Sequence, residues 1–112
     1  MNSIEPATER AARTFLDRVA RQYNVAGAIL FGSRARGDYR PDSDADIAVL
    51  LGGDPAEFFL TQRALSDIAY DILLDTDIRI QALPIWQTEW ERPETYSNPY
   101  LLQSIRQEGI PL

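Results

Sequence analysis

The chain has 112 residues, a formal net charge of −6 and an isoelectric point near 4.5, and it contains no Cys, His or Lys. These absences exclude a thiol or imidazole nucleophile, a classical zinc site, a Schiff-base lysine, the lysine of a P-loop and a disulfide scaffold. The acidic balance counts against direct, sequence-independent nucleic-acid binding. We expect one domain, residues 1–112, and a cytoplasmic protein without signal peptide or membrane span.

The first half of the chain alternates helical and strand-like patterns. Pro6 begins a predicted helix that runs to about Tyr23. One face of this helix is apolar and carries Ala12, Phe15, Leu16, Val19 and Tyr23. The next predicted elements are a buried strand over 25–31, a short helix over 33–37 and a second strand over 46–51.

Two further helices are predicted in the second half. Asp54 and Pro55 suit the N-cap and first position of a helix that runs to about Leu74. The last helix is expected over 98–109, because Asn98-Pro99 can begin a helix and Gly109 can end it. Residues 86–97 are expected to form a loop, and we assign three of its aromatic side chains to a lid or to core packing: Trp86, Trp90 and Tyr96.

A third strand is predicted over 77–83, where apolar and polar residues alternate. Its two faces are expected to carry Ile78, Ile80 and Ala82 on one side and Asp77, Arg79 and Gln81 on the other. Pro84 either ends this strand or marks it as a sheet edge. The order of elements predicts an α/β or α+β sandwich, with a small mixed sheet covered by helices on one side.

The most specific motif lies around the end of the first strand. Gly32-Ser33 is followed by ten residues and then by Asp44-Ala45-Asp46. Residues i and i+2 of a strand point to the same face, so Asp44 and Asp46 should project together beside the Gly-Ser turn. Two oxygen ligands next to a phosphate-sized backbone pocket suit a divalent ion that carries a nucleoside triphosphate.

With Ala35-Arg36-Gly37 and Ser43 as flanks, this stretch resembles the signature of the DNA polymerase β-type nucleotidyltransferase superfamily, and most of all the minimal nucleotidyltransferases (MNT). The segment 98–110 also resembles the C-terminal helix of such proteins. The resemblance implies a polymerase β-like nucleotidyltransferase fold. It further implies transfer of AMP from ATP to a hydroxyl, with Mg²⁺ or possible Mn²⁺ as the cofactor.

The resemblance also suggests roles for individual residues. Asp44 and Asp46 would hold the metal, and the backbone and hydroxyl of Gly32 and Ser33 would bind the β- and γ-phosphates. Arg36 is a candidate phosphate contact and Arg34 a weaker one. Either arginine could instead neutralise the acidic cluster or lie in solvent.

The family usually adds a third carboxylate that acts as a base toward the acceptor hydroxyl. Asp77, at the start of the predicted third strand, is our candidate for this role and for a metal ligand. Alternatively, the position falls further along, at Arg79 or Gln81. The carboxylate would then be missing and catalysis weak or absent. Asp75 is a poorer candidate, because it is expected at the end of the preceding helix.

The acceptor is expected on another molecule. Aminoglycoside-modifying members of the superfamily carry a second domain that holds the drug, for which this sequence has no length. Minimal nucleotidyltransferases are commonly the antitoxins of toxin–antitoxin pairs with HEPN-type ribonucleases, and can adenylylate a toxin tyrosine (AMPylation). The resemblance therefore implies an antitoxin that modifies a HEPN-type toxin. The alternative is a non-catalytic binding module that neutralises its partner by contact.

Overall fold

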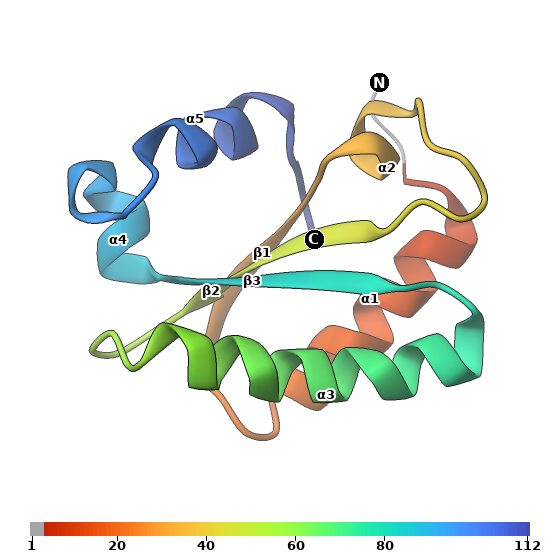
Figure 1. Cartoon of the computed structure of the whole chain (residues 1–112), viewed down its shortest axis with the longest axis horizontal. Helices are drawn as coiled ribbons and strands as arrows, with labels where there is room; N and C mark the ends of the chain where they lie inside the picture. The colour runs from red at the N-terminus through yellow and green to blue at the C-terminus, as the bar shows by residue number, and fades with distance from the viewer. Residues whose placement is uncertain (1–3) are drawn as a thin grey trace.

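The computed structural model describes residues 4–112 and contains one four-stranded sheet with helices on both of its faces (Figure 1). The strands lie in the order β3-β2-β1-β4, and their bounds are Val25–Phe31 for β1, Ala45–Leu51 for β2, Ile80–Trp86 for β3 and Ile110–Pro111 for β4. β1 pairs antiparallel with β2 and with β4, whereas β2 and β3 are parallel. The expected mixed sheet is confirmed, but β4 was not anticipated.

The helices are α1 (Pro6–Val19), α2 (Ser33–Arg36), α3 (Phe58–Thr76), α4 (Gln87–Glu91) and α5 (Pro99–Glu108), with a 3-10 turn over Pro93–Thr95. The predicted last helix is confirmed, with Asn98 as its N-cap and Gly109 directly after it. The α3 start was predicted too early. Its N-cap is Glu57, whose carboxylate accepts the Leu60 N–H at 2.6 Å, so Asp54 and Pro55 stay in the connection before the helix.

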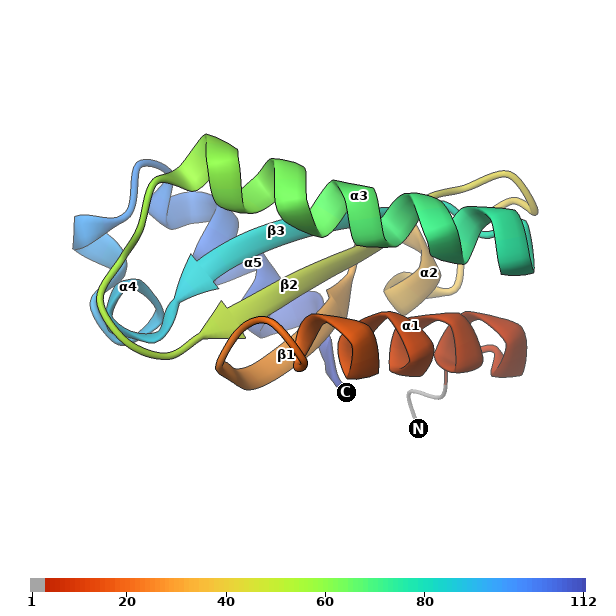
Figure 2. The ribbon, with the colours of Figure 1, turned by 90° about the horizontal axis from the view of Figure 1, so that it is seen from below.

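Helices cover both faces of the sheet, not one as expected. α1 and α3 lie on one face and α5 on the other (Figure 2). The side under α1 and α3 holds the larger core, which contains Phe15, Leu30, Ile47, Leu65 and Ile72. The side under α5 holds a smaller core of Ala48, Ile85, Tyr96, Leu102 and Ile105. β2 is therefore apolar at most positions along its length, as in a strand that is buried on both faces.

The third strand begins later than predicted. Asp77 ends α3 in a left-handed conformation, with φ 61° and its N–H bonded to Leu73 O, and β3 begins only at Ile80. Pro84 lies inside β3, which is an outer strand of the sheet, so its marking of an edge is confirmed. The absence of an N–H on Pro84 removes no hydrogen bond between β3 and β2, because the register directs the Pro84 nitrogen away from β2.

The segment 86–97 is more ordered than the expected loop. It contains α4 and the 3-10 turn, and at the start of α4 the Glu89 carboxylate accepts the Trp86 N–H at 3.0 Å. Trp86 and Tyr96 are buried in the two cores, and Trp90 is half-buried against the smaller one, so their assignment to packing is confirmed. Within residues 4–112, no helix combines the length and apolar character needed to cross a bilayer.

Candidate active site

The Gly-Ser turn joins β1 to the short helix α2. Gly32 has φ 75° and ψ −158°, a combination that essentially only glycine adopts. A Cβ atom at this position would lie 2.2 Å from Oδ2 of Asp46. Glycine is therefore required twice here, for its backbone angles and for the space that the carboxylate occupies. The sequence suggested only the approach of a phosphate, whereas the space in front of Gly32 also holds an acid.

Asp46 is the second residue of β2, and this strand lies between β1 and β3 in the sheet. Its partners in the sheet are Phe31 on β1 and Gln81 on β3. Ile47 belongs to the core under α1 and α3, while Ala48 belongs to the core under α5. Because side chains alternate along a strand, Asp46 points to the α5 side of the sheet. The predicted closeness of the carboxylate to the Gly-Ser turn is confirmed.

Asp44 and Asp46 are close enough to affect each other electrostatically. The pKa of Asp46 is raised above its ordinary value, first because the carboxyl is half-buried and second because of the negative charge of Asp44. The positive charge of Arg36 acts in the opposite direction. Two repelling carboxylates at the mouth of a turn form a place where a divalent cation would be favourable.

Asp44 lies just before β2 and is more open to solvent. Its Oδ1 is 3.9 Å from Nε of Arg79, and both side chains are well exposed. Such an exposed pair contributes little to stability, since water screens it. Arg79 can therefore move away from Asp44 at small cost.

Arg34 is buried and holds the loop that leads to Asp44. Its Nε donates to the Ser43 carbonyl at 2.9 Å, one terminal nitrogen donates to the Pro41 carbonyl at 3.1 Å, and the other to the Thr8 hydroxyl at 2.9 Å. The guanidinium thus ties α2, the loop and α1 together. The sequence offered Arg34 as a weak phosphate contact. The Ser43 and Pro41 carbonyls reach Arg34 only in the folded loop, so no sequence pattern predicts these hydrogen bonds.

Arg36, in contrast, is exposed on the outer side of α2. It forms ion pairs with Asp38 at 3.4 Å and with Glu108 of α5 at 3.3 Å. These hydrogen bonds raise the pKa of the Arg36 guanidinium. Arg36 is therefore a cation near Asp46 with anionic partners of its own.

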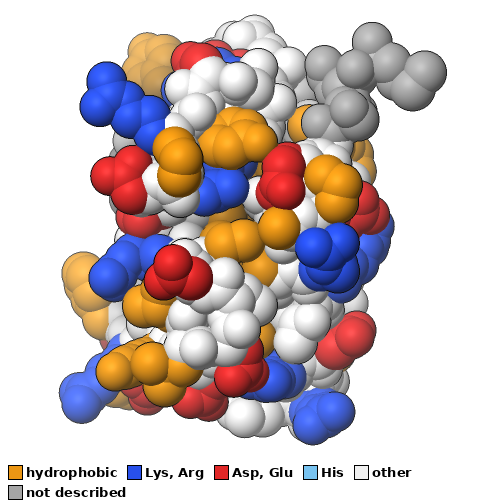
Figure 3. Space-filling model, turned by 90° about the vertical axis from the view of Figure 1, so that its right-hand side faces the viewer, with side chains coloured by type: hydrophobic (Ala, Val, Ile, Leu, Met, Phe, Trp, Pro, Cys, Tyr) orange, Lys and Arg blue, Asp and Glu red, His pale blue; other side chains and the backbone are white. Residues whose placement is uncertain are grey.

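On the side of the molecule where the loop and the end of α3 meet, arginine and acidic side chains are interspersed and form no single patch (Figure 3).

Comparisons with known proteins agree with this geometry. A model of the nucleotidyltransferase domain matches residues 12–110, a stretch that includes both the Gly-Ser turn and the Asp-x-Asp pair. The chain belongs to the nucleotidyltransferase domain family. Its structure also resembles that of a Sulfolobus solfataricus protein assigned as a nucleotidyltransferase, with 24% identity, a TM-score of 0.52 and coverage of 82% of this chain and 84% of that one. No protein with a curated description matches the sequence.

Membership of this family defines the general chemistry. Nucleotidyltransferase domains act on a nucleoside triphosphate and generally use a divalent metal ion. The pair Asp44 and Asp46 fits such an ion, because both offer hard oxygen ligands and a cation would relieve the repulsion between them. Water can complete the coordination, as is usual for Mg²⁺.

Asp77 does not occupy the position expected for a third acid of this nucleotidyltransferase domain. The predicted position of Asp77 at the start of the third strand is wrong, since Asp77 ends α3 three residues before β3 begins. Its role as a metal ligand stays a prediction. It borders a surface hollow together with Pro41, Asp42, Ser43, Leu73 and Arg79. Among residues 4–112, no three acidic side chains are grouped in a way that could hold a metal ion.

The β3 residue beside Asp46 is Gln81. The two are register partners in the parallel β2–β3 ladder, and Gln81 is exposed on the same face of the sheet. A carboxylate at this position would lie next to the Asp pair, but the chain has an amide there. Among the two alternatives considered from the sequence, Arg79 and Gln81, the register places Gln81 next to Asp46.

Proposed function

We propose that the protein is a Mg²⁺-dependent adenylyltransferase that moves AMP from ATP to a hydroxyl on a partner protein. The observation that carries this proposal is the position of the Asp46 carboxylate directly in front of Gly32, with Asp44 close enough to raise its pKa. The site thus combines two metal-ligating oxygens with a backbone turn at a helix start, the parts needed to hold a metal–triphosphate complex.

Each group would have a distinct task. Asp44 and Asp46 would hold the metal, which would supply charge stabilisation for the α-phosphate and the leaving pyrophosphate. Gly32 and Ser33 would bind the distal phosphates, and Arg36 could exchange its exposed acidic partners for a phosphate. The acceptor oxygen forms a bond to the α-phosphorus. The bond between the α-phosphorus and the oxygen that bridges to the β-phosphate breaks, so pyrophosphate leaves. The acceptor proton is lost to solvent or to a carboxylate.

The HEPN-type toxin is the partner that fits the resemblance to minimal nucleotidyltransferases. Within residues 4–112 the sheet, α1 and α3 form the core that supports the site, and both faces of the sheet are covered. An acceptor would therefore have to approach over the surface around Asp46. We infer an antitoxin role in which adenylylation of the toxin neutralises it.

A non-catalytic binding module is the second candidate, and one observation favours it. The β3 residue beside Asp46 is an amide, Gln81, and Asp77 lies at the end of α3. A site with two acids and no nearby base would bind a metal–nucleotide complex while transferring slowly. The partner would then be neutralised by contact alone.

Mass spectrometry of a co-expressed partner separates the two candidates. An adenylyltransferase leaves an AMP group on the partner, and Asp46→Asn abolishes the modification together with neutralisation. A binding module leaves no AMP, and Asp46→Asn still binds and neutralises the partner. The matched control is Asp42→Asn, an exposed acid in the loop before the pair, which should leave modification unchanged in either case.

A further inference from the structure

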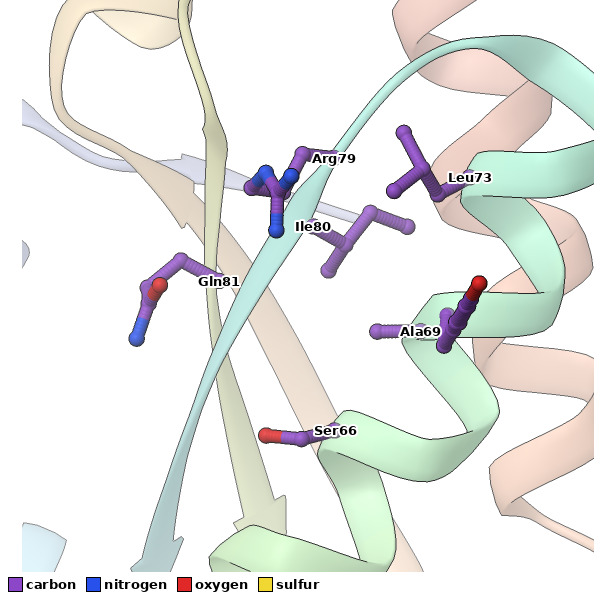
Figure 4. Close-up of a pocket in the computed structure, with 7 residues that line it drawn as sticks. Ser66, Ala69, Leu73, Arg79, Ile80 and Gln81 are labelled. Carbon is purple, nitrogen blue, oxygen red and sulfur yellow. The ribbon is translucent and has the colours of Figure 1, made fainter.

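The β3 side of the candidate site is formed by a guanidinium and an amide. The Ala45 N–H donates to the Arg79 carbonyl at 2.8 Å at the start of the parallel β2–β3 ladder, so Arg79 is held beside Asp44. Two residues further along, Gln81 lies beside Asp46. Figure 4 shows Arg79 and Gln81 on the side of β3 that faces away from α3, which is also the side to which Asp46 points.

The Arg79 guanidinium has unused hydrogen-bonding capacity. Its Nε lies 3.9 Å from Oδ1 of Asp44, which is close enough for an ion pair but too long for a hydrogen bond. Among residues 4–112, Asp44 is its only ion-pair partner. Arg34, in contrast, donates to three oxygen atoms, and Arg36 donates to two carboxylates. Of these three arginines, Arg79 is the one that can bind a new anion without breaking a hydrogen bond.

The Arg79 side chain also has room to move. It is 64% exposed, and it borders two surface hollows, one beside Tyr70 and one beside Asp77. Water screens an ion pair that is so exposed, and holding its two side chains in place costs conformational entropy. The guanidinium can therefore leave Asp44 without any change in the packed core.

Arg79 would have to leave Asp44 when a divalent ion binds the Asp pair. The ion would bind carboxylate oxygens of Asp44 and Asp46, and the guanidinium lies 3.9 Å from one of these oxygens. Two cations at the same oxygen repel each other. A nucleotide that arrives with the ion brings phosphate oxygens next to the displaced guanidinium, which then has a new anionic partner.

We propose that Arg79 is a phosphate-binding residue of the nucleotide site, paired with Asp44 in the free protein and with the triphosphate in the complex. A planar guanidinium can donate two parallel N–H groups to phosphate oxygens. With the turn at Gly32 on the β1 side, the Asp pair then has phosphate-binding groups on both sides. The inference rests on the proposed function in one respect, because it takes the site to bind a metal–nucleotide complex.

This change of partner couples the binding of metal to the binding of nucleotide. In the free protein Arg79 competes with the ion for Asp44, whereas in the complex it holds the phosphates. Arg79 therefore adds to the direct attraction between the ion and the phosphates. Each ligand should raise the affinity for the other by the same factor, and that factor should be smaller without Arg79.

Arg79→Ala should change two affinities in opposite directions. Mn²⁺ alone should bind about two- to fivefold more tightly, because its competitor for Asp44 is gone. α,β-Methylene-ATP with saturating Mn²⁺ should bind at least about tenfold more weakly, because a charge-assisted contact to phosphate is lost. Tripolyphosphate with Mn²⁺ should lose affinity by the same factor, since Arg79 contacts phosphate and not the base. Calorimetry measures all three affinities and requires no transfer reaction.

Two further variants are the controls. Arg79→Lys keeps the charge but lacks the planar fork, so Mn²⁺ should bind as it does to the wild type, while nucleotide affinity falls between the other two proteins. Arg63→Ala removes the same charge from the exposed surface of α3, on the opposite side of the sheet from Asp46, and should leave all affinities unchanged. Both arginines are exposed, so the melting temperatures should stay at the wild-type value.

The outcomes separate this inference from the proposed function. The two opposite changes, without AMP on a co-expressed partner, support Arg79 as a phosphate contact and contradict the adenylyltransferase. An unchanged nucleotide affinity in Arg79→Ala overturns the inference and leaves the transferase in place. Equal or weaker Mn²⁺ binding in that variant also overturns it, because Arg79 would then support Asp44 and not compete for it. A wild-type protein that binds neither Mn²⁺ nor the nucleotide contradicts both proposals.

Discussion

A Cβ atom on Gly32 would lie 2.2 Å from Asp46 Oδ2, so the turn and the carboxylate occupy adjoining space that only glycine leaves open. Gly32→Ala should therefore displace Asp46 in addition to straining the backbone at φ 75°. We expect a loss of about 1–3 kcal/mol in the free energy of unfolding. Weaker metal binding should accompany it, which calorimetry with Mn²⁺ would detect.

Gly37→Ala is the matched control for this prediction. Gly37 also has a positive φ, 92°, but a Cβ there meets nothing within 4 Å. This variant should lose stability while its affinity for Mn²⁺ stays normal. If Gly32→Ala binds Mn²⁺ as well as the wild type does, then Asp46 is not a ligand or can move freely.

A divalent ion together with ATP should raise the melting temperature. Ligand at ten times its Kd adds about 1.4 kcal/mol to the free energy of unfolding. For a domain of this size that corresponds to roughly 4–8 °C. The Asp44→Asn, Asp46→Asn double variant should show no such rise, and should be the more stable protein in the absence of metal because two repelling charges are gone. An equal rise in the double variant would exclude these residues as the metal site.

Removing the Arg34 side chain should loosen the loop that positions Asp44. Arg34→Ala leaves the Ser43 and Pro41 carbonyls without their donors, and we expect a cost of about 1–3 kcal/mol. Amide exchange in residues 38–44 should become faster, and metal affinity should fall. Arg40→Ala is the control, since Arg40 is exposed in the same loop. Unchanged exchange in the first variant would contradict the positioning role.

Gln81→Asp should complete a group of three acids beside Asp46. Without metal the added charge repels the existing pair and should lower the melting temperature. With Mn²⁺ the affinity should rise by about tenfold, because a third carboxylate ligand becomes available. Asp77→Asn, by comparison, should leave both quantities unchanged. A loss of transfer in Asp77→Asn would restore the role that the sequence first suggested for this residue.

The N-cap of α1 should make stability depend on pH. The pKa of Glu5 lies below its ordinary value of 4.5, because its carboxylate accepts the backbone N–H groups of Thr8 and Ala7 and the Thr8 hydroxyl. The stabilisation from this cap is therefore complete above pH 4.5 and is lost as the pH falls through the lowered pKa. Glu5→Gln should be less stable at pH 7 and should match the wild type in strong acid. Urea denaturation at both pH values measures the difference.

The site residues that lie on adjoining strands could be predicted from the sequence. Gly32 directly follows β1 and Asp46 is the second residue of β2, so the antiparallel pairing of these two strands brings the two ends of the motif together. The fold class could also be predicted, because the order of helices and strands follows from periodic apolar patterns along the chain.

Asp77 illustrates what the sequence could not decide. The alternation over 77–83 is a valid strand pattern, but α3 continues to Thr76 and ends only through the left-handed conformation of Asp77. This choice depends on packing between α3 and β3, which no local pattern reports. The buried contacts of Arg34 depend likewise on how the loop folds, and the two residues of β4 are too few to give a periodic signal.

Pro84 has a kinetic consequence. As the outward-facing residue that lacks an N–H, it limits any ladder on the β3 edge to a few hydrogen bonds around Ile80 and Ala82. A segment held by so short a ladder dissociates quickly. A second chain that paired with this edge would therefore not stay attached, which protects the protein against edge-to-edge aggregation.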